Sequence, residues 1–89
     1  MARVVFTSNL QRHVPCPDSE VRADTLRDAL QAVFDANPGV RDYVLDEQGE
    51  LRKHVMVFID GQRVRDRQGL SDAVHPSSEI FVLQALTGG

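Results

Sequence analysis

The residues best suited to covalent chemistry are the last three of the sequence, Thr87-Gly88-Gly89. Glycine has no Cβ and adopts backbone conformations closed to other residues, so two in succession could thread a narrow cleft. A carboxylate on Gly89 is a poor electrophile, and acyl chemistry there would require activation, most simply as an acyl-adenylate made from ATP. The activated carbonyl could then accept sulfur as a thiocarboxylate or be passed to an amine. The alternative is a frayed chain end without a chemical role.

The other side chains that could do chemistry do not combine into a site. Cys16 could relay a persulfide, but a lone cysteine more often packs as a small hydrophobe, and we favour that structural role. His13, His54 and His75 lack the spacing of a zinc site, which needs a fuller ligand set. The sequence has neither a glycine-rich phosphate loop nor a pattern that predicts a Ser-His-Asp triad. We therefore expect no metal, no cofactor bound by the chain itself and no enzyme activity.

Length and composition predict an ordinary globular protein, with 42% hydrophobic and 26% charged residues among 89. A chain of this length is expected to form a single domain over residues 1–89, with 87–89 as a flexible tail. It contains no apolar run long enough to span a membrane and no signal-peptide pattern. One cysteine cannot build a disulfide framework, which agrees with a reducing compartment, so we expect a cytoplasmic location.

The charge pattern weighs against nucleic acid as the main partner. The formal net charge is −3, whereas nucleic-acid-binding domains are usually basic. Arg63, Arg65 and Arg67 do cluster, but Asp60 and Asp66 are interspersed among them. A solvated strand edge is favoured here over a phosphate-binding patch.

One amphipathic helix is predicted over Leu26–Ala36, where apolar residues recur at helical spacing. Thr25 is expected at the N-cap, with Asp28 three residues on in place of the usual Glu or Gln of a capping box. The sequence Asn37-Pro38-Gly39 should end this helix.

The remaining elements are mostly strands. Strand signals occur at 3–7, 12–16, 55–59, 62–65 and 80–86. Pro15 and Pro17 place the second strand at a sheet edge, and it either ends at Cys16 or resumes over 19–23. Asp60-Gly61 predicts a hairpin turn. Residues 40–45 are interpreted as a connector with a helical turn and a short strand, 46–49 as a turn, and 69–74 as a short helical turn.

A single amphipathic helix can cover only one face of a sheet, so the order of elements predicts a two-layer α+β domain. The three most apolar strands, 3–7, 55–59 and 80–86, are expected at the centre of the sheet. This arrangement is the β-grasp, or ubiquitin-like, architecture.

The whole chain resembles the MoaD/ThiS family of ubiquitin-like sulfur carriers. The matching segments are RVVF, TLRDAL, NPG, VLDEQGELRKHVMVFIDGQRVRD, GLSDAV and the final LTGG. The chain departs from the family where Pro76-Ser77-Ser78-Glu79 stands in place of a Gly-Asp pair before the last strand. It also has Gln84-Ala85-Leu86 where a proline often precedes the tail.

The resemblance implies a sulfur carrier rather than a catalyst. A ubiquitin-activating-enzyme-like adenylyltransferase would use ATP to adenylate Gly89, and a sulfurtransferase or persulfide donor would convert the adenylate to a thiocarboxylate. A downstream enzyme would then accept the sulfur. Gly88 would supply the slim approach to the active site, and the catalytic residues would all lie on these partners.

An apolar interface is expected on the sheet face that the helix leaves uncovered. In the last strand, Ile80, Val82 and Gln84 point one way, and Phe81, Leu83 and Ala85 the other. Met56 and Phe58 likewise oppose Val55, Val57 and Ile59. We expect Phe58, Phe81 and Leu83 at the centre of a partner interface that also includes Leu86. The alternative is that a loop over 40–50 folds across this face.

Two further functions stay open. The chain could be a protein modifier that forms isopeptides through Gly89, although Lys53 is its only lysine and this disfavours chains built on itself. It could also be a ubiquitin-like binding module whose tail is idle. The pathway that would receive the sulfur and the oligomeric state are not predicted.

Overall fold

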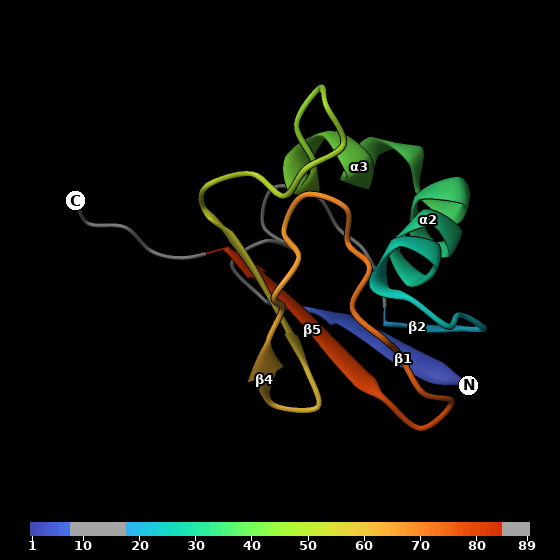
Figure 1. Cartoon of the computed structure of the whole chain (residues 1–89). Helices are drawn as coiled ribbons and strands as arrows, with labels where there is room; N and C mark the ends of the chain where they lie inside the picture. Colours follow the sequence, from blue (N-terminus) through green and yellow to red (C-terminus); the bar gives the residue numbers. More distant parts are fainter. Residues whose placement is uncertain (8–17, 85–89) are drawn as a thin grey trace.

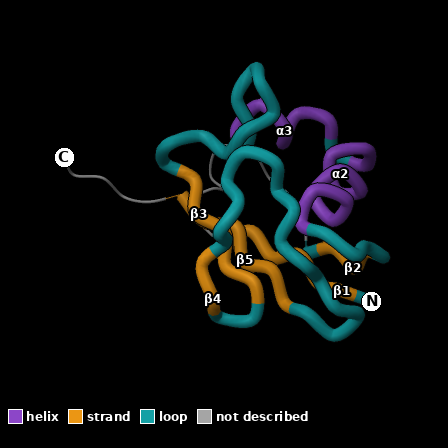
Figure 2. The backbone as a smooth tube through the Cα atoms, viewed as in Figure 1, coloured by secondary structure: helices purple, strands orange, loops and turns teal. Residues whose placement is uncertain are grey.

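The computed structural model describes residues 1–7 and 18–84. Five strands form one mixed sheet in the order β2-β1-β5-β3-β4. The strands are β1 (Ala2–Phe6), β2 (Ser19–Val21), β3 (Val55–Ile59), β4 (Gln62–Arg63) and β5 (Glu79–Gln84). Two helices, α2 (Leu26–Ala36) and α3 (Pro38–Val44), lie together on one side of the sheet (Figures 1 and 2). The prediction of a two-layer α+β architecture is confirmed.

The three apolar strands occupy the centre of the sheet, as predicted. β5 lies between β1, to which it is parallel, and β3, to which it is antiparallel. The edge strand that pairs with β1 is Ser19–Val21. The strand predicted at 12–16, with Pro15 and Cys16, lies almost entirely outside the described residues.

Helix α2 has the predicted bounds and the predicted cap. The side chain of Thr25 accepts a hydrogen bond from the backbone N–H of Asp28 at 3.3 Å, which satisfies a donor at the helix start. The helix ends where the backbone N–H of Asn37 bonds to the carbonyl of Val33 at 2.9 Å. Its apolar stripe is buried and consists of Leu26, Ala29, Leu30, Val33 and Phe34.

The two connecting segments differ from their predictions. In the segment 40–45 the helical part is longer than the predicted turn, because residues 38–44 form helix α3, and Pro38 can begin it since its fixed φ and missing N–H are tolerated at the first helical position. In place of the predicted short strand, Leu45 alone forms an isolated bridge with Leu51. The prediction of a helical turn at 69–74 was wrong. There the Asp66 carboxylate accepts hydrogen bonds from the N–H of Gly69 at 2.8 Å and from the hydroxyl of Ser71 at 2.6 Å, so the side chain organises the loop.

The two predicted turns are present. Asp60 and Gly61 both have positive φ, 51° and 83°, the backbone geometry of the type I′ turn that suits a two-residue hairpin. In the turn after Asp46, its carboxylate accepts hydrogen bonds from the N–H groups of Gln48 and Glu50.

The core lies between the helices and the inner face of the sheet. Alternate residues of the three central strands point into it, and they are Ala2, Val4, Phe6, Val55, Val57, Ile59, Ile80 and Val82. They join the α2 stripe in one apolar cluster that also takes Val40 and Val44 from α3. The residues between them on these strands therefore point to the opposite face of the sheet.

Candidate functional site

The Gly-Gly segment begins close after the central strand. β5 ends at Gln84, whose cross-strand partner is Val55, the first residue of β3. Leu86, Gly88 and Gly89 lie outside the described residues. Because an extended chain spans at most about 3.5 Å per residue, the five residues after Gln84 could carry Gly89 up to about 17 Å from the sheet. The segment that carries Gly89 therefore leaves the sheet at the end where β5 finishes and β3 begins.

The uncovered sheet face carries a row of apolar side chains. Cross-strand pairing aligns Phe81 with Val5 on one side and with Phe58 on the other. The next pair along β5 and β3 joins Leu83 to Met56. We call these five residues, Val5, Met56, Phe58, Phe81 and Leu83, the outer face. Phe81 is the most exposed of them at 37%, and the others are half-buried.

The alternation predicted along the last strand is present. Ile80 and Val82 are fully buried on the helix side, whereas Phe81 and Leu83 belong to the outer face. Helix α3 and the loop after it lie on the helix side, where Val44, Leu45 and Leu51 join the core cluster (Figure 2). The segment 40–50 therefore leaves the outer face uncovered.

Val5 was not predicted as part of the outer face, and Met56 was grouped with Phe58 but not placed at the centre of the interface. Val5 has the same alternation signal as Phe81, but only the register of β1 against β5 places the two side by side. Met56 was assigned to the correct face of its own strand, and its pairing with Leu83 places it in the apolar group.

One flank of the outer face, at β1 and β2, is acidic. Arg3 donates a hydrogen bond to Asp18 at 2.8 Å, and this bond and the charge of Asp18 raise the pKa of the guanidinium. Arg3 also lies beside Glu20 and Glu79 in the sheet register. With Arg3 paired to Asp18, Glu20 leaves the β2 edge with excess negative charge.

Ser78 is the one buried polar side chain among the described residues, at 1% exposure. Its hydroxyl accepts a hydrogen bond from the N–H of His75 and donates one to the Asp60 carboxylate, both at 2.9 Å. Asp60 also accepts from the N–H of Glu79 at 2.9 Å. The hydrogen bonds from Glu79 and then Ser78 hold the pKa of Asp60 below its ordinary value. These bonds fix the β3–β4 turn to the start of β5.

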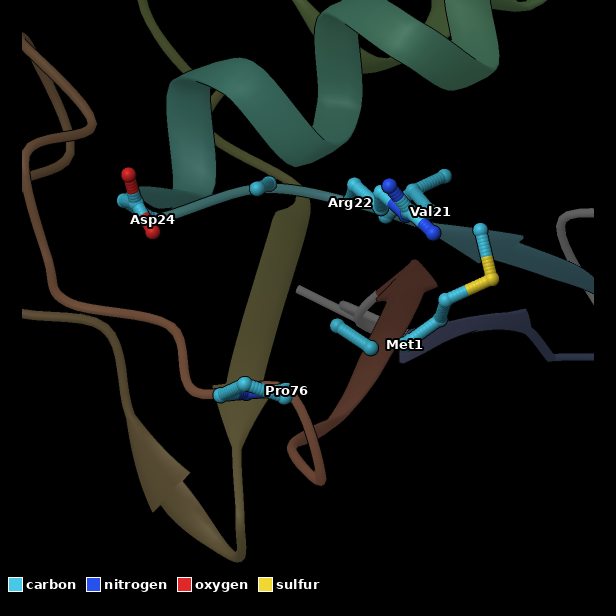
Figure 3. A pocket seen from close by; sticks show the side chains of 7 residues that line it. Met1, Val21, Arg22, Asp24 and Pro76 are labelled. Carbon is cyan, nitrogen blue, oxygen red and sulfur yellow. The ribbon is translucent and has the colours of Figure 1, made fainter.

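A cavity of about 300 Å³ opens at the other end of the sheet. Figure 3 shows Met1, Val21, Arg22, Asp24 and Pro76 around it. Because β1 and β5 run parallel, this cavity next to the start of β1 lies at the opposite sheet end from Gln84. Its lining contains no nucleophile or metal ligand set, so it adds no chemistry to the Gly-Gly segment.

No potential metal site was found in the described part of the chain. His54 and His75 lie in separate loops there, while His13 and Cys16 fall outside it. Across residues 1–7 and 18–84, no helix is long and apolar enough to span a membrane.

Neither a family model nor a curated protein matches this sequence. Solved structures do match it over nearly its whole length. CysO in the BexX/CysO complex from Amycolatopsis orientalis is 21% identical, with 100% of both chains covered and a TM-score of 0.83. SAMP1, the small archaeal modifier protein 1 from Methanosarcina acetivorans, is 22% identical, with 99% of this chain and 95% of that chain covered and a TM-score of 0.80.

CysO from Mycobacterium tuberculosis is 20% identical, with 97% of this chain and 100% of that chain covered and a TM-score of 0.80. These neighbours are ubiquitin-like sulfur carrier or modifier proteins of the MoaD/ThiS type. At such identities the likeness establishes the architecture of the chain and not its activity. The chain has the ubiquitin-like β-grasp fold.

Proposed function

We propose that this chain is a sulfur carrier whose C-terminal glycine, Gly89, is adenylated by a ubiquitin-activating-enzyme-like adenylyltransferase and then converted to a thiocarboxylate. The observation that carries the proposal is the combination of an open apolar sheet face with a Gly-Gly segment that follows the central strand of that face. A partner that binds the outer face would also fix the position of Gln84, the residue from which the Gly-Gly segment continues, relative to the partner's nucleotide-binding site.

The chemistry needs only the carboxylate from this chain. A Gly89 carboxylate oxygen attacks the α-phosphorus of ATP, and pyrophosphate leaves. The terminal sulfur of a persulfide on a sulfurtransferase then attacks the carbonyl, AMP leaves, and an acyl disulfide joins the two proteins. A second thiol of that partner attacks the disulfide, which releases the thiocarboxylate and leaves a disulfide on the partner. Gly88 allows a close approach because it has no side chain. The chain itself performs no acid–base step and binds no cofactor, and it is not an enzyme in this scheme.

The outer face is the docking surface in this proposal. Phe58, Phe81 and Leu83 form its centre, with Leu86 continuing the contact toward Gly88. Aromatic residues commonly dominate the affinity of such interfaces, and Phe81 is the most exposed apolar residue of the sheet. The solved BexX/CysO complex supports partner binding by a protein of the same fold. The scheme has no role for nucleic acid or membranes, and we place it in the cytoplasm, where ATP is supplied.

A protein modifier is the second candidate. SAMP1, a modifier by name, has the same fold at similar identity, and the same activated Gly89 would then be passed to lysines of other proteins. A ubiquitin-like binding module without tail chemistry is the third.

Intact-mass analysis of the chain purified from its native cells separates these functions. We expect a fraction of the chain to carry a gain of about 16 Da, because oxygen is exchanged for sulfur at Gly89. A ladder of larger conjugates that depends on Gly89 would instead identify a modifier. A mass that stays unchanged in sulfur-rich and sulfur-starved growth would reject both and favour the binding module.

A further inference from the structure

The charges of the chain are unevenly distributed. Residues 52–67, from the lead-in of β3 to the loop after β4, contain five basic and two acidic residues. The rest of the chain contains five basic and eleven acidic residues. A protein of net charge −3 therefore concentrates its positive charge in one segment. We call this set the basic flank, and it consists of Arg52, Lys53, Arg63, Arg65 and Arg67.

The structure brings the two halves of the basic flank together. The loop after β4 runs back beside β3, since the N–H of Val64 bonds to the carbonyl of Val57 at 2.9 Å. Further along, the Arg67 guanidinium donates to the carbonyl of Arg52 at 2.7 Å. Figure 1 shows β4 and this returning loop on the β3 side of the sheet. The basic residues thus share one edge of the molecule.

These cations have no ion-pair partner within the described residues, where the one salt bridge joins Arg3 to Asp18. The nearby carboxylates are already occupied. Asp60 accepts from Ser78 and Glu79, and Asp66 accepts from Gly69 and Ser71.

Asp72 accepts from the backbone N–H groups of Arg65 and Asp66, at 2.9 and 2.8 Å. The carboxylates near the flank therefore hold loops in place. The guanidinium of Arg52 donates to the carbonyl of Asp42 at 2.6 Å, and that of Arg67 to the carbonyl of Arg52, whereas Arg63 and Arg65 are exposed to a partner.

The basic flank is continuous with the outer face. Arg63 is exposed and is the cross-strand partner of Phe58, so the apolar row from Val5 through Phe81 to Phe58 ends on an arginine. At the opposite edge of the sheet, β2 presents Glu20, which pairs with Arg3. Glu79 begins the central strand β5 and lies beside the β3–β4 turn, since its carbonyl accepts a hydrogen bond from the N–H of Asp60. From the β2 edge to the β4 edge, the surface therefore changes from acidic at Glu20 through apolar to basic at Arg63.

We propose that the basic flank recognises an acidic protein surface next to the apolar pocket into which the outer face docks. This inference rests on the proposed function, and it names the chemistry of the partner surface. On the partner, carboxylates should face Arg63 and Arg65, apolar side chains should face Phe58 and Phe81, and a basic group should face Glu20. Such complementarity steers association and fixes the orientation of docking.

A protein surface fits the flank better than nucleic acid does. The basic residues adjoin an apolar face of the kind that protein partners bury, and the whole chain is acidic. A nucleic acid would meet repulsion from the eleven acidic residues outside residues 52–67.

The first test uses the double variant Arg63→Glu/Arg65→Glu in ATP–pyrophosphate exchange with the adenylyltransferase of the source organism. We expect KM for the carrier to rise about tenfold or more at low salt, because reversed rim charges slow association. The effect should shrink at about 0.5 M NaCl, where charges are screened within a few ångströms. Arg27→Glu on α2 is the matched control, and its KM should stay within about twofold of the wild type. Equal KM values for the double variant and the control would overturn the proposal.

A second test does not depend on that enzyme. The labelled chain is titrated with poly-L-glutamate and with oligothymidylate of equal charge, and backbone amide shifts are followed by NMR. We expect poly-L-glutamate to perturb residues 52–67 selectively, and the double variant to lose this response. Tighter binding of oligothymidylate than of poly-L-glutamate would overturn the proposal and identify nucleic acid as the ligand of the basic flank. If the wild type supports no exchange but selectively binds poly-L-glutamate, the carrier proposal fails while the inference about the flank stands.

Discussion

Ser78 and Asp60, eighteen residues apart in the sequence, are joined by a hydrogen bond of 2.9 Å from the serine hydroxyl to the carboxylate. The bond ties the β3–β4 turn to the start of β5, so it helps to keep Phe58 and Phe81 in register on the outer face. Ser78 belongs to the segment Pro76-Ser77-Ser78-Glu79, where the sequence departs from the MoaD/ThiS pattern. The departure therefore has a structural role at this turn.

Ser78→Ala should lower the free energy of unfolding by about 1–3 kcal/mol, because it removes the hydroxyl that serves both His75 and Asp60 in a buried position. Urea denaturation measures the change. Ser77→Ala is the matched control, since Ser77 is exposed and its variant should stay within about 0.5 kcal/mol of the wild type. Equal stability of the two variants would show that the buried hydroxyl contributes nothing.

Stability should fall on acidification partly through Asp66. The hydroxyl of Ser71, followed by the N–H of Gly69, holds the pKa of this carboxylate below its ordinary value of 3.8. A lowered folded-state pKa stabilises the fold above the unfolded-state pKa, and this stability is lost as the pH falls through the folded-state pKa. The loss is therefore expected below about pH 4.

Asp66→Asn should flatten the dependence of stability on pH in that window, and urea midpoints measured from pH 2.5 to 6 give the slope. Ser71→Ala is the graded comparison, because it removes the largest cause of the lowered pKa and leaves the carboxylate in place. NMR titration of that variant should show a higher pKa for Asp66 than in the wild type. An unchanged pKa would contradict the assigned cause.

Much of this fold could be predicted from local sequence. The α2 stripe, the Thr25 cap and the Asp60-Gly61 turn each depend on residues within a few positions of one another. The missed extent of the helix at 38–44 and the wrong helical turn at 69–74 have a different origin. Pro38 is compatible with both the end of one helix and the start of the next, and the Asp66 side chain competes with helical hydrogen bonding in its loop.

The candidate site was only partly predictable for a related reason. Alternation along one strand reveals which residues share a face, and this correctly grouped Phe81 with Leu83. Which residues of other strands stand beside them depends on register, a long-range property that single-strand patterns do not contain. Only strand pairing therefore placed Val5 on the outer face and Arg63 beside Phe58 at its border.

Leu30→Ala should cost about 2–5 kcal/mol of stability, because Leu30 is 1% exposed in the centre of the α2 stripe and its truncation leaves a cavity. Thermal or urea unfolding measures the loss. Gln31→Ala, on the exposed side of the same helix, is the control and should change stability by less than about 1 kcal/mol. A small effect at Leu30 would mean that the core collapses around the deletion.

Phe81→Asp should weaken docking to the activating enzyme while the fold persists, since the side chain lies on the outer face and is 37% exposed. In ATP–pyrophosphate exchange, KM for the carrier should rise at least about tenfold, as expected for an aromatic anchor. Tyr43→Asp is the matched control, because Tyr43 is 47% exposed but belongs to α3 on the helix side. Circular dichroism verifies folding of both variants. Unchanged KM for Phe81→Asp would exclude the outer face as the docking surface.

Removing Gly89, or adding one residue after it, should abolish activation while folding and docking stay near normal. Deletion moves the terminal carboxylate by up to about 3.5 Å, and misplacement on that scale can cost a reaction orders of magnitude. The measurement is ATP–pyrophosphate exchange with the intact, truncated and extended chains, with binding to the enzyme followed in parallel as the control. The extended chain should regain activity only where a protease trims it. Equal exchange by all three chains would show that Gly89 is not the activated group, and the sulfur-carrier proposal would fall with it.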